Sequence, residues 1–114
     1  MSHINRAVAV IRPKQPYVDW ANNLPDATRP VTVDELGSDA LAVLIPSYDT
    51  DEESRYHLNK LAVDIFEYEL WAWCTREEWW PRKRTRPKFW EWFDVAIHSE
   101  VVDLCNAPLE REED

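Results

Sequence analysis

Glu69 is the residue whose position most suggests acid–base chemistry. On a helix that turns about 100° per residue, Glu69 falls near the centre of the apolar stripe of residues 58–73. A carboxylate buried there without a partner has a raised pKa and can act as a general acid or base, or bind a ligand. The same carboxylate could instead pair with Arg12, Arg55 or an arginine of residues 82–88. We predict Glu69 as the candidate catalytic residue and keep the ion pair as its structural alternative.

Polar side chains also follow each of two apolar segments, residues 7–11 and 40–45. Ligands of open α/β sheets bind beyond the carboxyl ends of the strands. If the ends of these two segments meet at one sheet edge, the polar groups there suit a small anionic or polar ligand. The predicted ligand-binding residues are Arg12, Lys14, Tyr17, Ser47, Tyr48 and Asp49.

Tryptophan and arginine are concentrated in one part of the chain. Six of the seven tryptophans lie between positions 71 and 92, and residues 82–88 hold five basic and no acidic side chains. Arginine and aromatic rings together can bind single-stranded nucleic acid, but a net charge of −9 opposes it, so we expect no nucleic acid partner. Both residue types are enriched at protein–protein contacts. The predicted partner-binding residues are Trp79, Trp80, Arg82, Arg84, Arg86 and Trp90.

The residue types exclude several other kinds of site. The single glycine, Gly37, rules out phosphate-binding loops that need several glycines, and no nucleophile elbow is present. No two histidines lie at close spacing, and Cys74 and Cys105 form no Cys-x-x-Cys pair. We therefore predict no metal site and no cofactor, and interpret both cysteines as reduced thiols.

The elements that must position these residues alternate between strand and helix. Residues 7–11 and 40–45 are almost wholly apolar, and a proline follows each, which is typical of buried strands. Residues 16–23 begin with proline and predict a short helix. Residues 33–36 predict one more helical turn, with Gly37 as its C-cap.

The strongest pattern predicts a long helix over residues 51–73. Thr50 and Glu53 form a capping box at its start, and Thr75 and Glu78 form another that opens a short turn over residues 76–80. The predicted apolar face of the long helix consists of Leu58, Leu61, Ala62, Ile65, Phe66, Ala72 and Trp73.

Residues 89–97 favour a strand by propensity, although a helix would also gather their apolar side chains on one stripe. The two alternatives differ for Asp94 and His98. On a helix these side chains lie four residues apart on one face and could share a metal, whereas on a strand they lie about 13 Å apart. Ser99 is predicted to cap a final helix that ends near Cys105.

The predicted fold class is therefore α/β, with strand, helix, strand, long helix, strand and helix in that order. We expect a single domain over residues 1–108, with a three-stranded sheet packed on helices, and an acidic flexible tail over 109–114. Helices on one face of such a sheet leave the other face uncovered, which favours a homodimer.

No apolar segment is long enough to span a membrane, and the first six residues lack the layout of a signal peptide. We therefore expect no membrane partner and a cytoplasmic location. The predicted function is binding rather than catalysis, by a homodimer or with a protein partner, through the tryptophan- and arginine-rich surface. The alternative is a small enzyme or ligand-binding protein that uses Glu69 and the loops after the first two strands.

Overall fold

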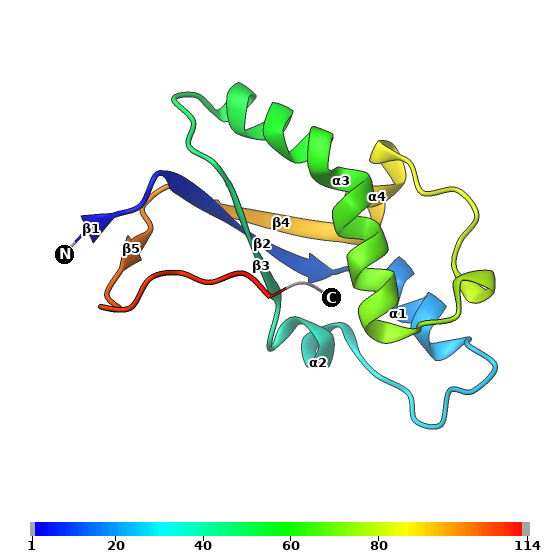
Figure 1. Cartoon of the computed structure of the whole chain (residues 1–114). Coiled ribbons are helices and arrows are strands. Elements are labelled where there is room, and N and C mark those ends of the chain that lie inside the picture. Colours follow the sequence, from blue (N-terminus) through cyan, green and yellow to red (C-terminus); the bar gives the residue numbers. More distant parts are fainter. Residues whose placement is uncertain (1, 113–114) are drawn as a thin grey trace.

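The computed structural model describes residues 2–112 and shows a mixed α/β fold (Figure 1). Three antiparallel strands form a sheet in the order β3-β2-β4, and the short strands β1 and β5 pair separately. The elements are β1 (Ser2–His3), β2 (Arg6–Pro13), α1 (Gln15–Asn22), α2 (Val33–Gly37), β3 (Leu41–Pro46), α3 (Asp51–Trp73), the 3-10 helix η1 (Glu77–Trp79), α4 (Arg86–Trp92), β4 (Phe93–His98) and β5 (Val102–Asp103).

The central strand β2 explains how the sheet is layered. Its odd-numbered residues Ala7, Ala9 and Ile11 are buried beneath the helices, whereas the even-numbered residues between them are only half-buried. Successive side chains of a strand point to opposite faces, so the helices cover one face of the sheet. Figure 1 shows α3 running across the sheet, with α1 and α4 towards one end and the β1–β5 ribbon at the other.

Helix α3 has the predicted bounds, 51–73. The Thr50 side chain accepts a hydrogen bond from the Glu53 amide at 3.1 Å, as the capping box predicts. At about 1.5 Å per residue the helix is roughly 35 Å long, whereas six-residue β3 spans only about 20 Å. Helix α3 is therefore longer than the strand beneath it.

Aromatic rings join the helices to the sheet. Phe66 of α3 lies 5.3 Å from Trp92 and 5.4 Å from Phe93, measured between ring centroids. Tyr17 of α1 lies 5.4 Å from the same Phe93 ring. Phe66 and Phe93 are fully buried. This junction fixes α1, α3 and the α4–β4 segment relative to one another.

The structure corrects several predictions for single segments. Residues 89–97 are neither all strand nor all helix, because α4 ends at Trp92 and β4 begins at Phe93. The predicted final helix after Ser99 is wrong, since this segment contains the short strand β5. The alternating order ending in a helix is therefore not what the chain adopts.

Smaller corrections concern the caps and the tail. Gly37 lies inside α2 without a positive φ, and the C-cap is Ser38. The cap of η1 is Arg76 rather than Thr75. Residues 109–112 of the predicted tail are exposed and without regular structure, while residues 113–114 lie outside the described part of the chain.

Candidate functional site

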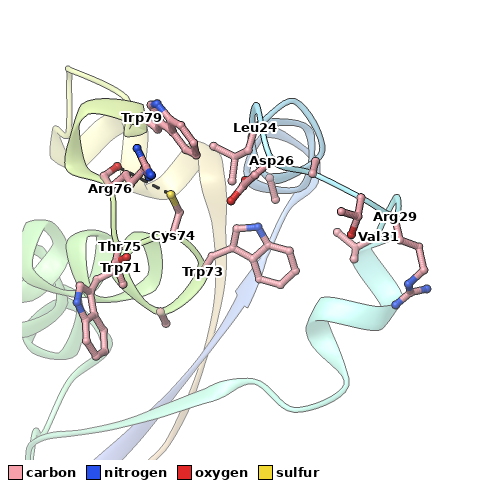
Figure 2. Close-up of a pocket in the computed structure, with 14 residues that line it drawn as sticks. Leu24, Asp26, Arg29, Val31, Trp71, Trp73, Cys74, Thr75, Arg76 and Trp79 are labelled. Carbon is pink, nitrogen blue, oxygen red and sulfur yellow. Dashed lines mark hydrogen bonds between the residues drawn. The ribbon is translucent and has the colours of Figure 1, made fainter.

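The last turn of α3 carries two exposed tryptophans beside a hollow. Trp71 and Trp73 are 46% and 41% exposed, because the helix extends past β3 at this end. The prediction that Ala72 and Trp73 lie on the core face is wrong for the same reason, since both are exposed. A hollow of about 480 Å³ lies between this turn and the segment from Leu24 to Val31 (Figure 2).

Hydrogen bonds fix the segment that faces the two tryptophans. The Asn22 side chain donates to the Val31 carbonyl at 3.0 Å and accepts from the Val31 amide at 2.8 Å. These two bonds close the loop after α1. Figure 2 shows the Trp73 indole directed into the hollow, with Asp26 on the opposite wall and the Arg29 guanidinium pointing away.

A second hollow of about 270 Å³ lies on the sheet side of Trp73. Trp73 and Ala72 line both hollows, so the indole stands between them. The second hollow combines apolar and acidic side chains, among them Leu36, Leu41, Glu35, Asp39 and Glu69. We call the two hollows together the Trp73 groove.

Glu69 is partly buried in this groove, as its place on the apolar stripe predicts. Burial raises the pKa of its carboxyl from 4.5 to about 7. Two of the expected ion-pair partners are engaged elsewhere: the Arg55 guanidinium lies 3.8 Å from the Trp90 ring centroid, and Arg84 pairs with Glu67 at 3.1 Å. Arg12 is exposed and makes no ion pair within residues 2–112. Among residues 2–112, no ion pair reaches the Glu69 carboxylate.

Tyr17 contacts Glu69 through the main chain rather than through the carboxylate. The Tyr17 hydroxyl donates to the Glu69 main-chain carbonyl at 2.6 Å, so this bond leaves the carboxylate free. Burial also raises the pKa of Tyr17 well above its usual value, which keeps the phenol protonated. Among residues 2–112, no side chain is hydrogen-bonded to the Glu69 carboxylate, so this group can contact a molecule that enters the second hollow.

The six predicted ligand-binding residues do not form one cluster. Strands β2 and β3 are antiparallel, with Arg6 opposite Pro46 and Ile11 opposite Leu41. Residues that follow β2 and residues that follow β3 therefore lie at opposite ends of the sheet. Arg12, Lys14 and Tyr17 are at one end, and Ser47, Tyr48 and Asp49 are at the other. Of the six, only Tyr17 lines the Trp73 groove.

The predicted partner-binding residues are largely engaged within the molecule. Trp80 is buried, and its indole N–H donates to the Cys74 carbonyl at 2.7 Å. The Trp90 N–H donates to Asn59 at 2.8 Å, and the Trp79 carbonyl accepts from Trp20 at 2.9 Å. Arg84 also donates to the Pro81 carbonyl, whereas Arg82 and Arg86 are exposed. These contacts attach residues 74–92 to α1 and α3.

The Trp80 contact predicts a measurable loss of stability. Trp80→Phe removes the indole N–H and leaves the Cys74 carbonyl unpaired at a buried site. We expect the free energy of unfolding to fall by about 1–2 kcal/mol, measured by urea denaturation. Trp71→Phe is the matched control, because Trp71 is exposed, and it should change stability by less than about 0.5 kcal/mol. Equal losses in both variants would contradict this role for Trp80.

Asp94 and His98 lie on β4, so they share a strand face at a separation too great to hold one ion. Within residues 2–112, no three His, Cys, Asp or Glu side chains gather closely enough for a metal site. None of the helices of this part of the chain combines the length and the apolar content needed to span a membrane. No family model, curated protein or solved structure matches the chain.

Proposed function

We propose that this protein is an interaction module whose Trp73 groove binds a segment of a partner protein carrying a basic side chain. The observation that carries the proposal is the position of Trp73. Trp73 is 41% exposed and lines two hollows, one of which Glu69 also lines, and no ion pair within residues 2–112 involves the Glu69 carboxylate. Partly exposed tryptophans beside pockets are typical of the few residues that dominate protein–protein affinity.

The shape and the apolar lining of the groove support a side chain as its occupant. The second hollow, at about 270 Å³, is of a size that suits one long side chain. Leu36, Leu41 and the Trp73 ring can contact the methylene groups of a lysine or arginine. The face of an indole also attracts a cation electrostatically. The groove therefore offers both an apolar wall and an aromatic face to such a side chain.

The acidic groups of the groove support a basic rather than an acidic partner. Glu35, Asp39 and Glu69 line the second hollow, and the chain as a whole carries a net charge of −9. Arg29 lies 3.3 Å from Glu35 and offsets part of this charge, but both side chains are exposed. Because Glu69 titrates near pH 7, an arriving cation should displace its proton, and binding should strengthen as the pH rises.

The proposal can be tested with peptide probes and the indole N–H signals of the protein. The probes are acetyl-Leu-Lys-Leu-amide, acetyl-Leu-Arg-Leu-amide and, as the matched control, acetyl-Leu-Glu-Leu-amide. We expect the two basic peptides to shift the Trp73 indole resonance, which Trp73→Phe identifies by its loss. Glu69→Gln should weaken this binding about tenfold without changing the other indole signals.

The pH dependence provides a second readout of the same site. The lysine peptide should bind more tightly at pH 8 than at pH 6, and Glu69→Gln should remove most of this difference. An equal response to the acidic peptide, or no Trp73 shift with either basic peptide at several millimolar, would overturn the proposal.

A further inference from the structure

Strand β3 lies at one edge of the sheet and lacks the usual protection against pairing. Its sequence from Leu41 to Pro46 contains no charged residue, and its only proline is the last residue. Natural sheets normally protect such edges with charges, prolines or bulges. The opposite edge, β4, carries Asp94 and His98. An unprotected apolar edge of this kind favours the addition of another strand.

The hydrogen bonds of β2 show which groups of β3 are free. The Lys14 amide donates to the Trp92 carbonyl at 2.8 Å, which continues the pairing of β2 with β4. Even-numbered β2 residues therefore bond to β4, and odd-numbered ones bond to β3. In β3, the residues opposite those odd-numbered positions are Leu41, Val43 and Ile45. Ala42 and Leu44 consequently direct their main-chain N–H and C=O groups to the open edge.

We propose that a second copy of this chain pairs with this edge, β3 against β3, in antiparallel orientation about a two-fold axis at Val43. In this register each Ala42 lies opposite Leu44 of the second copy. Both residues have outward-directed main-chain groups, so each pair exchanges the two hydrogen bonds of an antiparallel ladder. The result is one continuous six-stranded sheet. Pairings centred on Ala42 or Leu44 bring fewer of these groups into register.

The side chains also suit this two-fold arrangement. On the open face, the small Ala42 meets the larger Leu44, and no charge is buried. On the covered face, one flank of α3 faces α4 and the segment before it, because Asn59 bonds to Trp90 and Glu67 pairs with Arg84. The opposite flank of α3 would approach the same flank of the second copy. Helical spacing places Leu61 and the 46%-exposed Tyr68 on that flank. His57 and the exposed Asp64 lie on the same flank, so the apolar part of the contact consists of the strand edge with Leu61 and Tyr68.

The same register brings the segment after β3 of one copy close to the segment before β3 of the other, although the two segments lie at opposite ends of the sheet in a single copy. Counting along the paired strands, Ser47 of the second copy lies opposite Asp39. The segment after β3 of one copy therefore reaches the end of the sheet where the second hollow of the Trp73 groove lies. The pairing itself is inferred from β3 alone and does not depend on which ligand the groove takes.

Sedimentation velocity and a backbone block test the dimer. The full chain at about 50 μM should sediment at twice its 13.5 kDa mass. Ala42→Pro removes an outward-directed N–H and should raise the dimer dissociation constant at least tenfold. A proline whose missing N–H faces away from the neighbouring strand is tolerated at an edge. Ala42→Val is the matched control, because it keeps the N–H and should remain dimeric.

Leu44→Lys gives the same test without changing the backbone. Leu44 is 44% exposed, so a lysine there leaves the core intact but puts a charge into the paired edge. If Ala42→Pro fails to fold, the sedimentation of Leu44→Lys tests whether β3 forms the dimer contact. A monomeric wild type, an assembly larger than a dimer, or a folded edge variant that stays dimeric would overturn the proposal.

Discussion

Phe66→Ala should lower the free energy of unfolding by about 3–5 kcal/mol, the largest effect we expect from a single substitution. Phe66 is fully buried and contacts Trp92 and Phe93 at centroid distances of 5.3 and 5.4 Å. Its removal leaves a cavity where α3 meets the sheet. Because domains of this size are stable by about 5–15 kcal/mol, the variant should be close to its unfolding threshold at room temperature.

Urea denaturation followed by far-ultraviolet circular dichroism measures this loss. Val63→Ala on the same helix is the matched control, since Val63 is 36% exposed and its truncation should cost less than about 0.5 kcal/mol. If Phe66→Ala cost no more than Val63→Ala, the aromatic junction would not be what holds α3 against the sheet. The junction also positions the last turn of α3, so we expect the Trp73 groove to lose its shape in this variant.

The second large effect concerns Glu69 and pH. Burial raises its pKa in the folded protein from 4.5 to about 7, so the folded state binds more protons than the unfolded state between these values. The free energy of unfolding from this group is therefore greatest at low pH and decreases as the pH rises from about 4.5 to about 7. Since Glu69 is only partly buried, we expect a total decrease of about 1–3 kcal/mol.

Glu69→Gln removes this titration and should stabilise the protein at pH 8 while leaving its stability near pH 4.5 almost unchanged. Thermal unfolding at a series of pH values between 4 and 8 compares the variant with the wild type. Glu52→Gln is the control, because Glu52 is exposed at the other end of α3. A Glu69→Gln variant that is less stable than the wild type at pH 8 would mean that the carboxylate has a stabilising partner.

Short sequence patterns predicted the helix starts that depend only on neighbouring residues. The capping box at Thr50 gave the start of α3, and Pro16 marked the first turn of α1. The start of α4 had a comparable signal, because Thr85 accepts a hydrogen bond from the Lys88 amide at 3.3 Å and Pro87 lies in the first turn. The strand propensity of the aromatic residues after Pro87 concealed it, since Phe89 and Trp92 are core residues in either structure.

The candidate site was harder to predict because it depends on relations between distant elements. The apolar stripe of α3 correctly placed Glu69 on the inner face, but periodicity cannot show where the sheet beneath a helix ends. Trp73 was therefore predicted inward, although it lies beyond β3. The direction of β3 relative to β2 also follows from no local pattern, and it decides that Tyr17 and Ser47 lie at opposite ends of the sheet.

The scarcity of glycine, with Gly37 as the single one, lowers the conformational entropy of the unfolded chain. Across residues 2–112 the backbone makes every turn without a positive φ, so the only glycine serves no turn that requires one. The chain also contains eight prolines, each with a fixed φ. Its unfolded state therefore samples fewer conformations than that of a glycine-rich domain, and folding loses less entropy. Part of the stability of this protein thus comes from the stiffness of the chain before it folds.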